Sequence, residues 1–315
     1  MSFASEVKNE LAAAEPGKKC CQLAQITGIM RFAGSVTLGP GGMGIKVSTG
    51  NAAAARLFIT LMKGYFGAKA ALFVAQSNRL TKKRMYELSI TPDMNADAIL
   101  REVGILSVKE GSNYITDGLP KDIIKKRCCK KAMLRGIFLA AGSVSDPSKS
   151  YHLELKCDGK EMAMDVMKLV NSFGLKAKIA ERRTKYIVYI KDGEQIEDFL
   201  SIIGASRNLF KFQDVRITKE MKNKANRLAN CENANLDKSV NAAQKQLLDI
   251  ALIASETGLA ALPEKLRVVA EARRDNPELS LSELTECFDP PISKSGLNHR
   301  FEKIAQIANT IRGDV

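Results

Sequence analysis

Residues 23–36 read LAQITGIMRFAGSV, and residues 132–144 read AMLRGIFLAAGSV. Each stretch follows two basic residues and two adjacent cysteines, KKCC at 18–21 and KRCC at 126–129. The two cysteine pairs are 108 residues apart (128 − 20). A repeat at one long offset predicts two duplicated domain halves rather than a series of short solenoid repeats.

Each stretch predicts a short apolar helix with an internal glycine, Gly28 in the first and Gly136 in the second. Such a glycine costs about 1 kcal/mol relative to alanine, which is tolerated where another segment must approach the helix backbone. We expect that segment to be the other copy, so that the helices pack side by side on a pseudo-twofold axis. The alternative is two separate buried helices. A membrane span needs about 20 apolar residues, and Arg31 and Arg135 interrupt these stretches.

Residues 134–142, LRGIFLAAG, resemble the LAGLIDADG motif of homing endonucleases, and residues 26–34, ITGIMRFAG, resemble a weaker version. The resemblance implies two central helices that each end in a metal-binding acid just before the last glycine. Those positions are Ala33 and Ala141 here. Because two-metal phosphodiester cleavage needs carboxylates to hold the cations, the resemblance implies the scaffold without the chemistry. Asp146 has no counterpart after the first motif, and we interpret it as a turn residue.

The remaining pattern predicts the same order of elements in both halves. In the first half we expect a hairpin at 35–38 and 45–49, a helix at 51–65, strands at 70–76 and 84–90, and a helix at 93–103. In the second we expect a strand at 151–157, a helix at 160–173, strands at 176–180 and 185–190, and a helix at 194–203. The predicted fold is therefore α+β: duplicated LAGLIDADG-like αββαββα halves related by a pseudo-twofold axis, followed by an all-α helix-turn-helix domain.

The domain organisation follows from these elements and from composition. Residues 208–230 are polar and charged and predict a linking helix, and the low hydrophobicity of residues 230–235, NCENAN, predicts a break after it. In chain order we expect an N-terminal helix (1–17), a first LAGLIDADG-like half (18–110), a second half (111–205), a linking helix and linker (206–240), and a helix-turn-helix DNA-binding domain (241–315).

The last third predicts a helix at 241–256, a second from Pro263 to Arg274, a short helix opening at Ser280, and a final helix capped by Ser293. Ser280 and Glu283 have the spacing of a capping box, and the final helix has a predicted buried stripe of Leu297, Phe301, Ile304 and Ala308. This is the order of a helix-turn-helix, whose last helix contacts base edges with its first turns. Asparagine pairs with adenine, and arginine or lysine pairs with guanine. The alternative is a helical bundle that contacts protein. The candidate DNA-binding residues are Ser293, Lys294, Ser295, Asn298, His299, Arg300 and Lys303.

The chain carries a net charge of +13, with a pI near 9.4, which favours a polyanionic partner over a merely soluble basic protein. Residues 241–315 hold nine Lys/Arg and eleven Asp/Glu, a net of −2, so residues 1–240 hold +15. A basic hairpin tip in each half supplies candidate phosphate contacts, unless these tips are simply solvated. The residues are Arg79, Lys82, Lys83, Arg182, Arg183 and Lys185.

Cysteine and histidine usage predicts no metal and no cofactor. The seven cysteines form no CxxC pair and only two histidines are present, so the spacing of a zinc site is missing. The two adjacent-cysteine pairs could meet near the axis and bind metal or oxidise, but we favour small buried residues at helix starts. We see no signal peptide or membrane anchor, and the odd cysteine count fits a reducing cytoplasm. We expect a cytoplasmic, nucleoid-associated protein.

Two degenerate LAGLIDADG halves followed by SKSGLNHRFEKI at 293–304 resemble the WhiA family of bacterial regulators along essentially the whole chain. The resemblance implies a non-catalytic transcriptional regulator that binds double-stranded DNA and acts in cell division, chromosome segregation or sporulation of a Gram-positive bacterium. It also implies contact with a second transcription regulator or RNA polymerase. Two alternatives remain, an active endonuclease with displaced acids and a protein-interaction scaffold.

Overall fold

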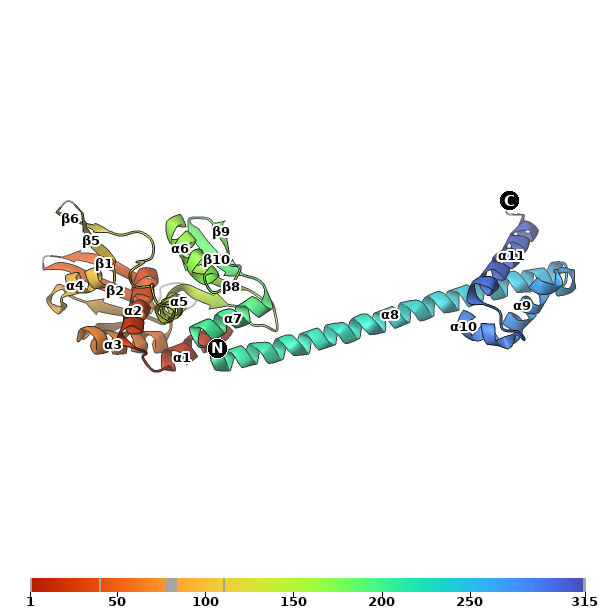
Figure 1. Cartoon of the computed structure of the whole chain (residues 1–315), viewed down its shortest axis with the longest axis horizontal. Helices are drawn as coiled ribbons and strands as arrows, with labels where there is room; N and C mark the ends of the chain where they lie inside the picture. Colours follow the sequence, from red (N-terminus) through yellow and green to blue (C-terminus); the bar gives the residue numbers. More distant parts are fainter. Residues whose placement is uncertain (1, 40, 77–83, 110, 314–315) are drawn as a thin grey trace. The chain divides into compact units, whose positions relative to one another are not determined.

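The computed structural model describes residues 2–39, 41–76, 84–109 and 111–313. The chain divides into two compact units, Met1–Lys219 and Glu220–Val315 (Figure 1). Both halves of the predicted duplication lie in the first unit, and the helix-turn-helix lies in the second. No helix among the described residues is both long enough and apolar enough to cross a membrane.

The first half follows the predicted order, after an N-terminal helix, α1 (Phe3–Ala13). Its elements are α2 (Lys19–Ala33), β1 (Gly34–Gly39), β2 (Gly42–Thr49), α3 (Ala52–Phe66), β3 (Ala71–Gln76), β4 (Arg84–Ile90), η1 (Pro92–Met94) and α4 (Ala96–Glu102). A further hairpin, β5 (Leu106–Lys109) with β6 (Ser112–Ile115), was not predicted from the sequence.

The second half repeats this order without the extra hairpin. Its elements are α5 (Arg127–Ala141), β7 (Gly142–Val144), β8 (Leu153–Cys157), α6 (Lys160–Asn171), β9 (Lys178–Arg182), β10 (Lys185–Ile190) and α7 (Gly193–Ile203). The strand orders, β1-β2-β4-β3 and β7-β8-β10-β9, are equivalent. The predicted α+β fold with duplicated αββαββα halves is confirmed.

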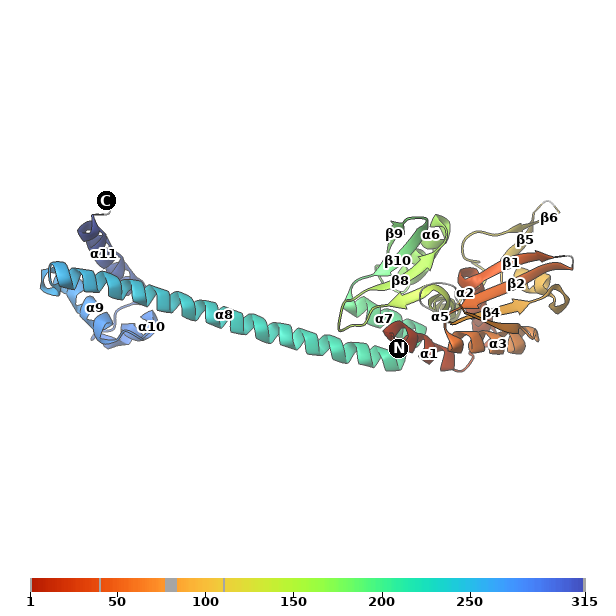
Figure 2. The same cartoon turned by 180° about the vertical axis from the view of Figure 1, so that it is seen from behind.

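The two motif helices, α2 and α5, pack against each other at the centre of the unit, with one sheet on either side (Figures 1 and 2). A Cβ added to Gly28 would lie 2.6 Å from the Met133 carbonyl oxygen, and one added to Gly136 would lie 2.3 Å from that of Gln25. Real Cβ atoms do not approach so closely, so only glycine permits this contact. The expectation that each internal glycine allows the other motif helix to approach closely is confirmed.

The sheets bury one face each against helices and share one core. In the first sheet Val47 and Leu88, which are register partners, are buried under α3. In the second sheet Leu155 and Val188 are paired in the same way under α6. Because side chains alternate along a strand, the other face of each sheet points away from these helices. We call it the open face.

One long helix, α8 (Ser206–Glu256), replaces the predicted linking helix, break and following helix. The predicted break at residues 230–235 is therefore wrong. No glycine or proline occurs in residues 206–256, and asparagine costs a helix only about 0.7 kcal/mol. The low hydrophobicity of this stretch reflects exposure to solvent on every side of the helix, because residues 221–238 are all exposed.

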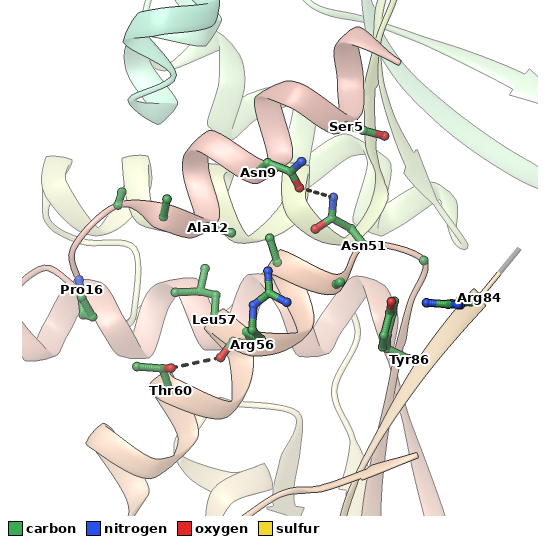
Figure 3. Close-up of a pocket in the computed structure, with 15 residues that line it drawn as sticks. Ser5, Asn9, Ala12, Pro16, Asn51, Arg56, Leu57, Thr60, Arg84 and Tyr86 are labelled. Carbon is green, nitrogen blue, oxygen red and sulfur yellow. Dashed lines mark hydrogen bonds between the residues drawn. The ribbon is translucent and has the colours of Figure 1, made fainter. Parts of the chain in front are cut away.

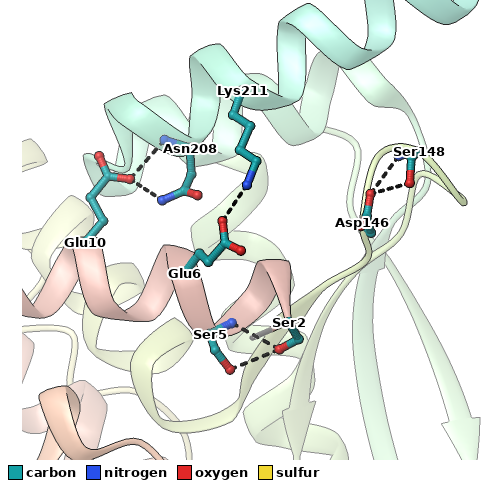
Figure 4. Close-up of polar contacts among 8 residues, drawn as sticks. All are labelled: Ser2, Ser5, Glu6, Glu10, Asp146, Ser148, Asn208 and Lys211. Carbon is teal, nitrogen blue, oxygen red and sulfur yellow. Dashed lines mark hydrogen bonds and ion pairs between the residues drawn. The ribbon is translucent and has the colours of Figure 1, made fainter.

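The start of α8 is held by α1 (Figure 4). The Glu10 carboxylate accepts hydrogen bonds from the backbone N–H of Arg207, at 2.6 Å, and of Asn208, at 3.0 Å. Lys211 pairs with Glu6 at 2.7 Å. Free N–H groups at a helix start favour a negative charge, so Glu10 caps α8 from another helix.

The second unit has its own core. It contains the end of α8, η2 (Leu259–Ala261), α9 (Glu264–Asp275), α10 (Leu281–Leu284), η3 (Thr285–Cys287) and α11 (Lys294–Arg312). The capping box of Ser280 and Glu283 is confirmed. The buried Arg273 guanidinium donates to the Gln246 side chain and to the Leu279 carbonyl oxygen, at 3.1 and 2.5 Å, and thereby joins α9 to α8 and to the segment before α10.

Candidate nucleic-acid interface

The predicted recognition helix is α11, and its first turn is fixed by Ser293. The Ser293 hydroxyl accepts a hydrogen bond from the Gly296 N–H at 3.2 Å. This satisfies one of the N–H groups that a helix start leaves without an intrahelical partner. Ser293 therefore acts as a helix cap, which positions the residues that follow it.

The buried side of α11 determines which residues it presents to solvent. The predicted apolar stripe is confirmed, because Leu297, Phe301, Ile304 and Ala308 are buried in the core of the second unit. The opposite side carries the candidate DNA-binding residues. Lys294, Ser295, Asn298, His299 and Lys303 are exposed, and Arg300 is half-buried.

An acid that sequence reasoning did not single out lies among these candidates. Glu302 accepts a hydrogen bond from Asn298 Nδ2 at 3.1 Å, and its carboxylate is 3.6 Å from His299 Nδ1. The spacings of four and three residues on one helix place these side chains together. This bond occupies one of the two N–H groups of Asn298 Nδ2, and the Glu302 carboxylate itself repels phosphate.

The open face of the second sheet is basic. Lys185 and every second residue after it on β10 lie on this face, together with their register partners on β8 and β9. These partners include Arg182, Lys178 and Lys156. All four side chains are exposed. Lys185 is paired with Asp158. The sequence pointed to Arg182 and Lys185 as candidates but not to Lys156 and Lys178. Which face of a sheet a residue lies on depends on how the strands pair, and this pairing is not visible in the sequence.

One acid lies within this basic face. Glu154 is a register partner of Tyr189, and its carboxylate is 3.6 Å from Lys156 Nζ, 4.0 Å from Arg182 and 3.4 Å from His152. Three basic groups therefore surround one carboxylate. Arg183, the remaining candidate in this half, is exposed in the β9–β10 turn with a left-handed φ of 56°.

The open face of the first sheet differs in its chemistry. Register places Lys46 there beside Ser35 and Ser89, and Lys46 forms an ion pair of 2.7 Å with Glu87 on the same face. The charges of this pair cancel. The other candidate phosphate contacts, Arg79, Lys82 and Lys83, lie outside the described residues.

The positions of the missing catalytic acids lie at the ends of α2 and α5. Ala33 lines a small, mostly apolar hollow whose other walls include Ile29, Val47 and Leu139, together with one polar residue, Thr49. Asp146 forms a local turn, in which one carboxylate oxygen accepts from the Ser148 N–H at 2.9 Å and from its hydroxyl at 2.6 Å (Figure 4). These bonds hold the pKa of Asp146 below its usual range, and they agree with its interpretation as a turn residue.

Comparison with known proteins gives matches along the chain. Residues 19–106 match the WhiA N-terminal LAGLIDADG-like domain, residues 130–222 the WhiA LAGLIDADG-like domain and residues 225–308 the WhiA C-terminal HTH domain. The "Probable cell division protein WhiA" of Clostridium perfringens is 45% identical over 312 residues, which is 99% of each chain. The protein of the same name from Alkaliphilus metalliredigens is 42% identical over 314 residues, again 99% of each.

The chain belongs to the WhiA family. A solved structure agrees with this assignment. Full-length DUF199/WhiA from Thermatoga maritima has a TM-score of 0.59 and 26% identity, and the match covers 98% of this chain and 99% of that one. The LAGLIDADG-like fold of the WhiA family is degenerate in this chain, because alanine occupies both acid positions.

The WhiA-family scaffold brings four cysteines together in this chain. The sulfur atoms of Cys20, Cys21, Cys128 and Cys129 all lie within 4.8 Å of one another. The sequence favoured small buried residues at helix starts, but only Cys129 is buried, whereas Cys128 is exposed. Burial raises the pKa of Cys21 to about 11 and that of Cys129 to about 12, and a hydrogen bond from Cys21 lowers the pKa of Cys128. The spacing of cysteines along the sequence does not reveal this cluster, because two of its cysteines lie on α2 and two on α5.

A hollow of about 960 Å³ lies beside α1, α3 and β4, away from the open face (Figure 3). Arg56, Arg84 and Tyr86 line it, together with an amide pair in which Asn51 Nδ2 donates to Asn9 Oδ1 at 2.9 Å. Sequence reasoning did not find it, since its lining comes from three separated segments. Guanidinium and amide donors suit an anionic group.

Proposed function

We propose that this WhiA-family protein is a non-catalytic regulator that binds double-stranded DNA through the exposed face of α11. The observation that carries the proposal is the position of Lys294, Asn298 and Arg300 in the first two turns of a capped helix, within a segment that matches a helix-turn-helix model. In this motif those turns enter the major groove. Asn298 would read adenine, and Lys294 or Arg300 would read guanine.

The basic open face of the second sheet is the proposed source of phosphate contacts. The helix-turn-helix domain supplies little attraction to DNA by charge alone, since residues 241–315 carry a net charge of −2. Phosphate contacts position a protein on the duplex without reading sequence. Lys156, Lys178 and Arg182 would supply this nonspecific part of the affinity, with Arg183 at the adjacent turn.

The proposed role is transcription regulation in cell division, chromosome segregation or sporulation, exerted at the nucleoid with a second regulator or RNA polymerase. Cell division is supported by the names of the relatives. The absence of catalysis is supported by Ala33 and Ala141, because alanine supplies no ligand for the metal ions that cleave a phosphodiester.

The test is binding of the full-length protein to a pool of fragments from its own genome, with and without magnesium, scored for retention and for strand breaks. We expect selective retention without breaks. Asn298→Ala and Arg300→Ala should each weaken selective binding by about 1–3 kcal/mol. Lys245→Ala, which removes an exposed charge from α8, is the matched control and should change binding little.

Each other outcome contradicts part of the proposal. Breaks that require magnesium would establish an endonuclease with displaced acids. No retention at all, or equal binding by the Asn298→Ala, Arg300→Ala and Lys245→Ala variants, would favour a protein-interaction scaffold.

A further inference from the structure

The four clustered cysteines occupy equivalent places in the two halves. Cys20 and Cys21 are the second and third residues of α2, and Cys128 and Cys129 are the second and third residues of α5. The contact of Gly28 with Gly136 fixes how closely these helices approach. Two adjacent cysteines at each helix start therefore converge on the pseudo-twofold axis, although neither pair forms a binding motif alone.

The separations of the sulfur atoms fit one tetrahedral ion. A Zn–S bond of about 2.3 Å places the four sulfurs of a tetrahedral site about 3.8 Å apart. Cys128 and Cys129 are already 3.9 Å apart, and all separations are within 4.8 Å. Side-chain adjustments of an ångström or less close the site. A disulfide needs about 2.05 Å and would unite only two of the four sulfurs.

The chemistry of the ligands selects the class of metal. Thiolates are soft ligands that favour zinc, copper(I) or iron–sulfur clusters. A cluster of several irons bonds its thiolates to different iron atoms, which spreads the sulfurs more widely than a single ion does. The compact group therefore fits a mononuclear site. Four thiolates also leave no open position, which is typical of structural rather than catalytic zinc.

The surroundings offset the charge that such a site would carry. Four thiolates and one Zn²⁺ have a net charge of −2. Lys18, Lys19, Lys126 and Arg127 flank the cysteines in sequence. The group also lies at the first turns of two helices whose N-cap residues make no side-chain capping bond, and helix N-termini favour anions and thiolates. The exposure of Cys128 provides a path of entry.

We propose that these four cysteines bind a single zinc ion, which ties the start of α2 to the start of α5. Each thiol loses its proton on binding, so one Zn²⁺ replaces four protons and no electron is transferred. The site joins the two halves and does not depend on DNA binding. Its function is structural, because metal binding to the folded chain stabilises that state relative to the unfolded one.

The test uses the full-length protein, reduced, stripped with a chelator and kept anaerobic. Titration with Co²⁺ should give the visible absorption of a tetrahedral tetrathiolate site, saturate at one ion per chain, and reverse on addition of Zn²⁺. Loss of a residue that only hydrogen-bonds to a metal ligand weakens metal binding roughly 10–100-fold. Cys128→Ser removes a ligand itself and should weaken zinc binding by more than this. Cys231→Ser and Cys287→Ser, at exposed cysteines outside the group, are matched controls and should bind zinc normally.

A second measurement covers the case in which Cys128→Ser fails to fold. In the wild-type protein, zinc should protect four of the seven thiols from alkylation, and mass spectrometry should locate the protection at Cys20, Cys21, Cys128 and Cys129. Protection elsewhere, no uptake of zinc by the reduced protein, or unaltered uptake by a folded Cys128→Ser variant would each overturn the proposal. A disulfide between the helices in a protein that takes up no zinc would assign the group to thiol oxidation instead.

Discussion

The two halves of the first unit have the same order of elements but different open faces. The second sheet presents Lys156, Lys178 and Arg182, with Glu154 close to two of them, whereas the first presents the neutral pair of Lys46 and Glu87. The residues that the halves share are those that shape the backbone contact between them, above all the internal glycines and the cysteine pairs. Close packing of α2 against α5 therefore restricts which residues can stand at their contact, whereas the exposed residues of the two sheets can differ.

The largest expected effect comes from the shared glycines. Gly28→Ala or Gly136→Ala should destabilise the first unit by about 3 kcal/mol, because the added methyl meets backbone atoms that cannot move aside. Tyrosine fluorescence during urea unfolding measures this unit alone, since the chain lacks tryptophan and its tyrosines all lie between residues 65 and 189.

Gly64→Ala is the matched control for the glycine prediction. Gly64 is also inside a helix, α3, but an added Cβ there has no neighbour within 4 Å. Alanine should stabilise this helix by up to about 1 kcal/mol. If all three substitutions shifted the unfolding midpoint alike, close approach at the axis would not explain the internal glycines.

The next effect tests the difference between the open faces. Log affinity for DNA falls as log salt rises, with a slope of about −0.9 for each phosphate contact. Lys178→Ala combined with Arg182→Ala should make this slope shallower by roughly 1.8, because two contacts are lost. Lys160→Ala combined with Lys168→Ala removes equal charge from α6, which covers the other face of the same sheet. Equal slopes for the two double variants would rule out a phosphate-binding role for the open face.

The smallest effect concerns the acids. Glu154→Gln should tighten DNA binding a few-fold at low salt, because it removes the one negative charge placed among three basic groups. Stability should change by only about 1 kcal/mol, since ion pairs near the surface contribute little. Glu87→Gln in the first sheet is the counterpart and should leave affinity unchanged. Tighter binding by Glu87→Gln alone would mean that DNA contacts the first sheet instead.

The sequence predicted the order of elements because hydrophobic periodicity and turn residues are local signals. The capping box at Ser280 and the buried stripe from Leu297 to Ala308 were correct for this reason. The α8 prediction failed because low hydrophobicity was read as a break, whereas a helix needs no buried face when nothing in its sequence interrupts it.

The rest of the candidate site depends on contacts between distant residues. Lys156 and Lys178 join the basic face only through strand register, and the four cysteines meet only because two helices approach at Gly28 and Gly136. No spacing rule within one segment contains this information. Glu302 could have been found, because its distances of four and three residues from Asn298 and His299 are the spacing of helix neighbours.

The cap that α1 places on α8 has a consequence for biosynthesis. Glu10 leaves the ribosome nearly two hundred residues before its partners Arg207 and Asn208. Phe212, also near the start of α8, completes the same junction by packing against Phe3 and Tyr151. Until then α1 has only part of its native surroundings, so the first unit can close only when its last segment has been translated. The helix α1 is thus fastened by a helix that is made only after both LAGLIDADG-like halves.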